Sequence, residues 1–560
     1  MTSGGPDSPA ARLAGRVALP LALAVLGLVV WRSAFLIDDA FISFRYAAHW
    51  AAGQGLVYDL APGAEPVEGY SNFLWVALLA LGRVLGLAPE TFASVLSVLS
   101  AAGTVVLVRR FLAERLALDG SSVLLGTLAL AAYPVFGVWA TGGLETALFG
   151  LLLFGAWTLL VAEPAGVDSN QTEGTSAETR LGLLAGLVGG ALILTRVEGF
   201  LWIGGLWLAA FVALRRDLPK RRVALFLGVS LTVLAAQLAI RHVVYGELVA
   251  NTVLAKSGLS GATLVRGLKG LATWGLLFVW PVAALFAPLA AGQGRRRALA
   301  ISAFVMAGGA LDYSVLTGGD WMPFFRFLAP ASAFFAVLLA VGLERFGARA
   351  RLGLGVAAIA VAALPLVDLA LVPRAWREAL YFREFRIGYQ TEWERWTTGA
   401  ANTERNTWLG HSLAAVSGPE ETWTGGAIGA VAYYSEVTIL DRNGLVNREV
   451  AAREVEPGSG TAGHDKRVPR AYFEDRAPTF YEVLYAPIAL PQQGPAFDQA
   501  VRQMHATVFR DAEEAPLLRC TRVEVRSVRD VPGLPPRASV VLLVHTDERS
   551  ARAFWSRYGL

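Results

Sequence analysis

Long apolar runs occupy most of the first 372 residues and restrict the chain to a membrane fold. A run of about 20 apolar residues spans the hydrocarbon core of a bilayer as a helix. Only 17% of the 560 residues are charged and 54% are hydrophobic, too apolar for a soluble protein of this length. Eleven transmembrane helices are predicted, over 17–37, 91–108, 122–139, 144–161, 181–195, 199–214, 222–240, 271–290, 298–317, 324–342 and 352–372.

Arginine clusters between these runs predict the topology. If the further apolar run 72–87 dips into the membrane and returns, alternate loops carry the clusters on the side of the N-terminal tail, 1–16. Positively charged loops favour the cytoplasm, so the N-terminus is predicted inside and the C-terminus outside. The clusters are Arg109-Arg110, 215–222, 295–297 and 345–351. No small-residue cleavage site follows the first run, which is read as a retained helix in a bacterial inner membrane.

The composition changes after the last apolar run. Residues 17–372 form the predicted membrane module, and residues 373–560 have the ordinary polarity of one soluble domain. Short apolar runs at 427–434, 437–440 and 539–544 predict strands of an α/β fold, and 374–396 predicts an amphipathic helix at the membrane surface. With eleven spans this domain is extracytoplasmic. The fold class is therefore an α-helical polytopic membrane protein with a C-terminal extracytoplasmic α/β domain.

Two adjacent carboxylates, Asp38-Asp39, follow the first span directly and open the predicted outer loop 38–71. Desolvating a carboxylate at a membrane boundary is costly, so a pair there indicates a functional site. A helix N-cap followed by a first-turn acid is the structural alternative, but it requires only one well-placed aspartate.

Other polar groups gather in the loops predicted to lie on the same outer side. Asp38, Arg45 and His49 share one face if their segment is helical, a set that suits an anionic substrate. Structural ion pairs, turns and interfacial belt residues are the alternatives for the rest. The remaining candidates are Glu68, Tyr70, Glu145, Arg196, Glu198, Asn251, Lys256, Asp320, Trp321 and Arg326.

These motifs resemble those of the C-class glycosyltransferases (GT-C), polytopic enzymes that use polyprenyl-phosphate sugars. The acidic pair after the first helix is similar to the hallmark of that superfamily. More narrowly, the chain resembles the mycobacterial-type terminal arabinofuranosyltransferases and their bacterial relatives. The similar stretches are 38–45, 53–56, 68–72, 143–146, 194–199, 245–256, 319–322, 441–445 and 463–464. Val197 stands where many relatives have proline, and the last 90 residues match nothing in that pattern.

The resemblance implies sugar transfer to a glycan, glycolipid or protein acceptor, with Asp38 as the base and Asp39 positioning the acceptor or a metal. Sequence alone does not rank adjacent aspartates. Candidate ligands of the lipid phosphate are Arg45, His49, Arg196, Lys256 and Arg326, with Arg45 and Lys256 preferred. Cations at these positions or a divalent metal could stabilise the leaving phosphate, and no other cofactor is implied.

The C-terminal domain is expected to complete the acceptor site through Asp441 and His464, and several tryptophans could stack on sugars. A lipid-glycan flippase or transporter would also need many spans and outer cations, and it stays open as the alternative. A sensor anchored by its membrane part would leave the placed charges unexplained. A nucleotide cofactor has no support, because the chain has no glycine-rich phosphate loop. The expected partners are the lipid donor, the acceptor and the bilayer, and no nucleic acid.

Overall fold

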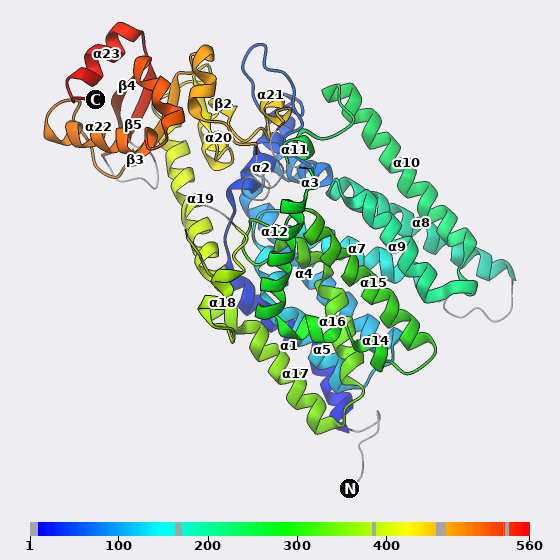
Figure 1. Ribbon diagram of the computed structural model, residues 1–560. Coiled ribbons are helices and arrows are strands. Elements are labelled where there is room, and N and C mark those ends of the chain that lie inside the picture. The colour runs from blue at the N-terminus through cyan, green and yellow to red at the C-terminus, as the bar shows by residue number, and fades with distance from the viewer. Residues whose placement is uncertain are drawn as a thin grey trace.

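The computed structural model describes residues 9–162, 171–256, 258–383, 388–454, 466–529, 531 and 537–560. Helices form a large bundle, and a smaller domain with a β-sheet sits on one end of it (Figure 1). The chain enters the bundle with α1 and passes into the small domain through α19, coloured yellow. This architecture confirms the predicted fold class.

The bundle contains helices of very different lengths. Their bounds, with η marking short 3-10 or π segments, are α1 (Pro9–Ser33), α2 (Asp38–Ala51), α3 (Phe73–Val84), α4 (Pro89–Arg110), η1 (Phe111–Arg115), α5 (Gly120–Ala132), α6 (Pro134–Gly137), η2 (Val138–Ala140), α7 (Thr146–Leu160), α8 (Gln171–Thr195), α9 (Gly199–Leu214), η3 (Arg215–Asp217), α10 (Lys220–Tyr245), α11 (Asn251–Leu254), α12 (Gly261–Leu277), α13 (Val279–Ala284), α14 (Ala287–Ala290), α15 (Arg295–Leu316), η4 (Arg326–Ala331), α16 (Ser332–Leu343), α17 (Ala348–Ala363) and η5 (Leu364–Val367).

Seven helical segments in the described residues are long and apolar enough to cross a membrane. They include α1, α4, α8, α10 and α15, and the count becomes eight if the bent pair α5 and α6–η2 is one span. Pro134 explains the 57° bend, because proline removes a helical hydrogen bond and restricts the residue before it. The chain is therefore a multi-pass membrane protein, and the count of eleven spans stays a prediction.

Three predicted spans fall on shorter or broken helices. The runs 144–161 and 199–214 correspond to α7 and α9, with 15 and 16 residues. The run 271–290 is not one helix, because it is divided among α12, α13 and α14 near Pro281 and Pro288. The run 72–87 forms α3, whose 12 residues extend only about 18 Å. That length is too short for a crossing of about 30 Å. It agrees with the prediction that this segment dips into the membrane and returns on the same side.

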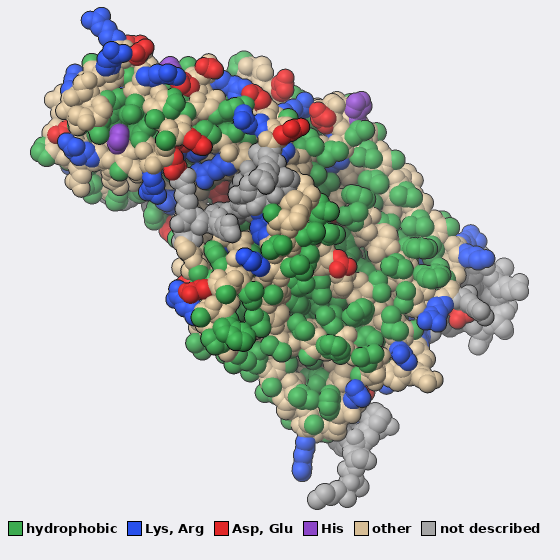
Figure 2. Space-filling view, in the orientation of Figure 1, with side chains coloured by type: hydrophobic (Ala, Val, Ile, Leu, Met, Phe, Trp, Pro, Cys, Tyr) green, Lys and Arg blue, Asp and Glu red, His purple; other side chains and the backbone are tan. Residues whose placement is uncertain are grey.

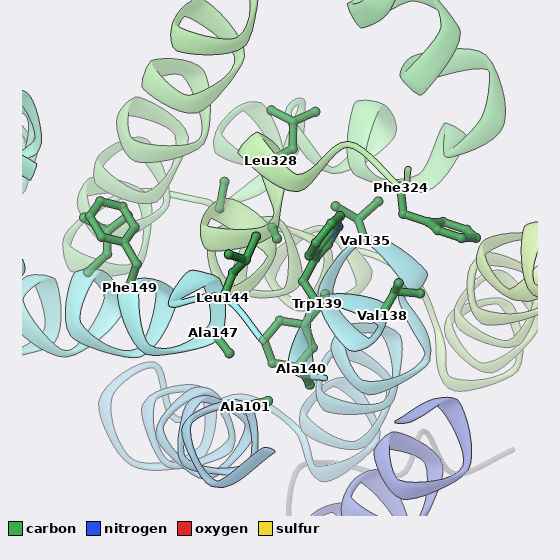
Figure 3. Packing of buried hydrophobic residues seen from close by; sticks show 14 of the residues in the cluster. Ala101, Val135, Val138, Trp139, Ala140, Leu144, Ala147, Phe149, Phe324 and Leu328 are labelled. Carbon is green, nitrogen blue, oxygen red and sulfur yellow. The ribbon is translucent and has the colours of Figure 1, made fainter. Parts of the chain in front are cut away.

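Aromatic and small side chains interlock inside the bundle. Figure 3 shows Trp139 lying between Val135, Ala140 and Leu144, with Leu328 of η4 and Phe324 close by. The indole nitrogen of Trp139 donates to the carbonyl of Pro323 at 3.2 Å, so the buried ring has no unpaired polar group. This packing holds the loop before η4 against the helices of the bundle.

The small domain contains a mixed five-stranded sheet in the order β2-β1-β3-β5-β4. Strands β1, β2 and β3 are parallel, and β5 pairs antiparallel with β3 and β4. The bounds are α18 (Arg374–Ala379), α19 (Glu392–Ala414), β1 (Thr422–Gly425), α20 (Ala430–Ser435), β2 (Thr438–Asp441), α21 (Arg448–Ala451), η6 (Arg470–Arg476), β3 (Phe480–Ala486), α22 (Pro495–Val508), η7 (Ala512–Arg519), β4 (Thr521–Val528), β5 (Ala538–His545) and α23 (Glu548–Ser556).

Two secondary-structure predictions in this domain are wrong in detail. The run 427–434 was expected to be a strand, and most of it forms the helix α20. The predicted helix 374–396 is interrupted, because α18 ends at Ala379 and α19 begins at Glu392. The other two predicted strands are β2 and β5.

Side-chain chemistry differs between the two parts of the surface. Figure 2 shows hydrophobic side chains covering much of the lower helical part, while charged side chains gather on the upper domain and at the lower tips. Exposed leucine, valine and phenylalanine side chains on a broad face need lipid rather than water around them. The small domain therefore lies beside the bilayer, outside its apolar layer.

Candidate active site

The first aspartate of the pair fastens the small domain to the bundle. Asp38 begins α2, directly after the extended residue Ile37. Its Oδ1 accepts hydrogen bonds from the Asn406 side chain at 3.1 Å and from the Ala430 amide at 3.0 Å. Its Oδ2 accepts from the Gly429 amide at 3.0 Å. A carboxylate with both oxygens engaged in this way is a poor base, which contradicts the preference for Asp38.

Gly429 allows this close approach. A side chain at this position would place its Cβ 1.8 Å from the carbonyl oxygen of Asp38. Such a distance is a severe steric clash, so only glycine fits without moving the small domain. Sequence reasoning missed both Gly429 and Asn406, since they lie 391 and 368 positions from Asp38.

The second aspartate has no hydrogen-bond partner among the described residues. Burial and the neighbouring Asp38 charge raise the pKa of Asp39 to about 6, while Arg326 and Lys256 oppose this shift. A carboxylate with a raised pKa and an uncommitted oxygen can accept a proton near neutral pH. The geometry therefore favours Asp39 over Asp38 as a base.

Two cations stand near Asp39 without strong partners of their own. The Lys256 residue is exposed, and its side chain makes no hydrogen bond or ion pair within the described residues. The Arg326 side chain is 11% exposed, and its Nε lies 3.9 Å from Asp320, beyond hydrogen-bonding distance. Asp39, Lys256 and Arg326 therefore make a cluster of one carboxylate without a hydrogen-bond partner and two cations that are not tightly paired, here called the outer charge cluster.

Arg196 lies behind this cluster in a buried network. Its guanidinium contacts Glu198 at 2.5 Å and Glu145 at 3.0 Å. The Asn72 side chain donates to the other Glu145 oxygen at 2.8 Å and also bonds with Ser43 of α2. The predicted residues Glu145, Arg196 and Glu198 thus come together, and they link α2, α7 and the end of α8. Their one positive and two negative formal charges leave the network with a net negative charge.

Arg45 and His49 are placed differently from the prediction. Arg45 is 2% exposed and donates to the carbonyls of Tyr58, Ala432 and Val437, and to Asp59. The His49 ring bonds with the Val57 carbonyl at 2.9 Å. These groups stabilise the loop after α2 and its contact with α20. The prediction that they bind phosphate is therefore wrong for Arg45 and lacks support for His49.

Four other predicted binding residues also have structural partners. Glu68 pairs with Arg241, and the Tyr70 hydroxyl lies 3.1 Å from that of Tyr245. The Asn251 amide donates to the Gly444 and Leu445 carbonyls, which ties α11 to the small domain. Asp441 is fully buried and accepts from the Asn443 and Val446 amides at 2.8 and 2.9 Å, so it shapes a turn. None of these arrangements leaves an accessible ligand group on Glu68 or Asp441.

The loop before η4 brings Asp320 and Trp321 to the same region. Asp320 accepts from the Met322 and Phe327 amides at 3.0 and 3.1 Å, which fixes the segment that carries Arg326. Trp321 contributes to the wall of the cavity described below. His464 lies outside the described residues.

A cavity of about 1120 Å³ separates part of the small domain from the bundle. Ile37, Asp38, Asp39, Trp321 and Pro323 line it on the membrane side, and α19 with the loops after β1 and β2 lines it on the other. A cavity of this size lies slightly above the range of about 300–1,000 Å³ that is usual for organic ligands. The free carboxylate of the outer charge cluster therefore faces a space that a substrate can enter.

The aspartate pair offers few ligand oxygens to a divalent metal. The oxygens of Asp38 already accept from amide donors, and the described residues include no group of three acidic, histidine or cysteine side chains placed to hold a metal. Calcium takes six to eight oxygen ligands, whereas magnesium can be held by one or two carboxylates together with substrate phosphates. The donor set therefore disfavours calcium at the pair, and a magnesium role for Asp39 stays a prediction.

Comparison with known proteins gives three results. The family model for a domain of unknown function, DUF8728, matches residues 385–521, most of the small domain. No curated protein matches the sequence. Among solved structures, ArnT from Cupriavidus metallidurans bound to undecaprenyl phosphate has a TM-score of 0.57 at 15% identity, covering 94% of this chain and 97% of that chain. The apo state of the same protein has a TM-score of 0.52, again at 15% identity and the same coverage.

Arabinofuranosyltransferase AftD from Mycobacteria gives a lower TM-score of 0.49 at 14% identity, over 94% of this chain and 40% of that chain. The match to ArnT extends over nearly the whole of both proteins, so it includes the bundle and the small domain in one arrangement. At this identity the likeness establishes the fold. The chain therefore has the fold of the GT-C glycosyltransferases, as its sequence motifs predicted.

Proposed function

We propose that this protein is a membrane glycosyltransferase that takes a sugar from a polyprenyl-phosphate donor and passes it to an acceptor on the extracytoplasmic side. The observation that carries the proposal is the outer charge cluster. It places one uncommitted carboxylate, Asp39, at the wall of a large cavity, and two cations, Lys256 and Arg326, are close enough to act on that carboxylate electrostatically. The GT-C fold supports it, and so does the undecaprenyl phosphate bound to ArnT.

The two cations suit the phosphate of the donor. Arginine and lysine bind phosphate oxygens, and arginine does so through two parallel hydrogen bonds. As the bond between the sugar and the phosphate breaks, negative charge grows on the phosphate, and fixed cations stabilise it. Lys256 and Arg326 are the proposed phosphate ligands, in place of the wider set that the sequence suggested.

Asp39 is the proposed general base. The acceptor hydroxyl gives its proton to the Asp39 carboxylate while its oxygen attacks the anomeric carbon of the donor sugar. The bond from that carbon to the phosphate oxygen breaks, and the lipid phosphate leaves with the electron pair. Asp38, held by Gly429 and Asn406, keeps the start of α2 in place so that Asp39 faces the cavity.

A flippase would place charged groups along a path through the bilayer. The uncommitted charges described above gather instead at one end of the bundle, beside the small domain. This concentration favours chemistry at a single site over transport. The proposal includes an N-terminus in the cytoplasm and a small domain outside a bacterial inner membrane, because the arginine clusters alternate in that way.

Removing either cation of the outer charge cluster should slow sugar transfer and weaken binding of the donor phosphate. Lys256→Ala and Arg326→Ala are each expected to raise the transition-state barrier by about 2–4 kcal/mol, as for the loss of one oxyanion donor. Single-turnover transfer would measure this effect, and binding of undecaprenyl phosphate to purified protein should weaken in parallel. Lys220→Ala, an exposed lysine at the start of α10, is the matched control. Binding within twofold of wild type in both test variants would remove this assignment.

The rate of transfer should depend on pH through Asp39. A base must be deprotonated, so the rate should rise as the pH increases through about 6, the value to which burial and Asp38 raise the pKa of Asp39. Asp38→Asn removes a neighbouring negative charge, so it should move this limb of the profile to lower pH while also reducing the maximal rate. A limb that stays in place in Asp38→Asn would show that another group is titrating.

A further inference from the structure

The segment that carries Lys256 is held in place by the small domain. Lys256 follows α11, a helix of one turn that Figure 1 shows beside α21, where the bundle meets the small domain. The Lys256 amide donates to the Val253 carbonyl at 3.3 Å, so the backbone of this lysine is tied to α11. Whatever fixes α11 therefore also fixes the position of this cation.

Apolar packing contributes little to the position of this segment. Among the apolar side chains of residues 247–256, only the small ones of Ala250 and Ala255 are buried. Leu248 is 58% exposed, and Val253 and Leu254 are 38% and 43% exposed. A segment with few buried apolar contacts opens locally at a low cost in free energy. The position of α11 therefore depends on the hydrogen bonds that it makes with other elements.

The first of these contacts is made by Asn251, the buried residue that begins α11. Its side-chain nitrogen donates to the Gly444 and Leu445 carbonyls at 2.7 and 2.8 Å. Because both partners are carbonyl oxygens, only the amide nitrogen can face them, and the orientation of the side chain is determined. The two carbonyls belong to the turn after β2, which the buried Asp441 carboxylate holds through two backbone amides. The acceptors for Asn251 are thus fixed within the small domain.

The second contact is made by Lys466 of the small domain. Its ammonium group donates to the Leu254 carbonyl at 2.7 Å and to the Ala451 carbonyl at 2.6 Å. Leu254 and Ala451 are the last residues of α11 and α21, and carbonyls in the last turn of a helix have no partner inside that helix. One ammonium group therefore joins the ends of two short helices, one from each part of the protein.

Within the described parts of the chain, no hydrogen bond joins α11 to another helix of the bundle, and both contacts come from the small domain. We infer that Asn251 and Lys466 are positioning residues for Lys256, and that the small domain thereby sets the affinity for the donor phosphate. The inference rests on the proposed function, in which Lys256 binds that phosphate. A cation already held in place needs no ordering when the ligand arrives, and this strengthens binding. Both residues act through Lys256 and not through contact with the lipid.

The test uses one variant at each contact. Asn251→Asp keeps the shape of the side chain but turns a carboxylate oxygen toward two carbonyls, and Lys466→Met keeps the length of the side chain but removes its donors. Lys466→Arg is the conservative variant, because a guanidinium group can donate to both carbonyls. Tyr434→Phe is the matched control, since it removes a different contact between the small domain and the bundle, the hydrogen bond from Tyr434 to Glu90 at 3.0 Å.

Binding of undecaprenyl phosphate to the purified full-length protein is the first measurement. Asn251→Asp and Lys466→Met should each raise its Kd by about fivefold to tenfold, the scale of one lost hydrogen bond. Lys466→Arg and Tyr434→Phe should bind within about twofold of wild type. When Lys256→Ala is already present, neither test variant should weaken binding further, because no cation is left to position. A general loss of structure would instead add to the effect of Lys256→Ala.

Hydrogen exchange of the amides of residues 251–256, measured without added lipid, gives a second readout and should be faster in both test variants. Weaker binding in Lys256→Ala, with unchanged binding in both test variants, would overturn the inference and leave the proposed phosphate ligand in place. Unchanged binding in Lys256→Ala would overturn the phosphate assignment and the effect on donor affinity together, and the exchange rates would then show separately whether the two contacts hold α11. Because the test variants lie at separate positions, one folded variant is enough to decide the result.

Discussion

Replacing Asp39 by asparagine is expected to slow sugar transfer by about 10²–10⁴-fold, the range for loss of a positioned general base. Asparagine has nearly the same shape but cannot take the proton of the acceptor hydroxyl. The affinity for undecaprenyl phosphate should not fall, because the proposed phosphate ligands are Lys256 and Arg326. Single-turnover transfer of a radiolabelled donor sugar measures the rate, and lipid binding to the same preparation measures the affinity.

Two comparisons give this prediction its specificity. Glu65→Gln changes an exposed carboxylate in the same outer loop and should leave the rate unchanged. Asp38→Asn should slow transfer through a misplaced α2, and its pH profile should still show a titrating base. If Asp39→Asn kept more than a third of the wild-type rate while Asp38→Asn lost all activity, the roles of the two aspartates would have to be exchanged.

Replacing Arg196 by alanine is expected to destabilise the folded protein by about 3–5 kcal/mol, the cost of breaking a buried ion pair by removing one partner. Arg196 is 7% exposed and lies between Glu145 and Glu198, which are 4% and 8% exposed. Without the guanidinium, two carboxylates stay buried, and the Asn72 amide and the Tyr313 hydroxyl give them only neutral donors. Unfolding in detergent, followed by tryptophan fluorescence, would measure the loss.

The origin of this loss can be checked by neutralising the carboxylates as well. In Arg196→Ala combined with Glu145→Gln and Glu198→Gln, no charge is left uncompensated, so part of the stability should return. The exposed pair between Arg519 and Glu474, at 2.8 Å, provides a contrast, and Arg519→Ala should leave the unfolding midpoint unchanged. A small loss in Arg196→Ala would indicate that water reaches the network.

The membrane helices could be predicted because their signal is local. A run such as 91–108 or 298–317 is apolar along its length, and the bilayer dictates how long it must be. The run 427–434 was harder, because an apolar segment of eight residues is compatible with a buried helix or a strand. Its helical form, α20, depends on contacts with α2 and α19, which the sequence of the segment does not contain.

The candidate site was predictable in its location but not in the role of each residue. An ionisable side chain near a membrane boundary is unusual whether it binds a ligand or another side chain. Arg45 and Lys256 therefore looked alike, although the Arg45 side chain donates to three carbonyls and the Lys256 side chain has no hydrogen-bond partner among the described residues. Asp38 and Asp39 also looked alike in the sequence, because the residues that hydrogen-bond to Asp38 lie far along the chain.

The contact of Asp38 with the small domain has a consequence for exchanging parts between related enzymes. Gly429 and Asn406 come from the small domain, and the aspartate that they hold adjoins the proposed base. A chimera that receives the small domain of another protein would lose these hydrogen-bond partners of Asp38 and, with them, the position of α2. In the proposed transferase, exchanging the small domain would therefore also disturb the residues that orient Asp39, so a change of outer domain is expected to alter turnover as well.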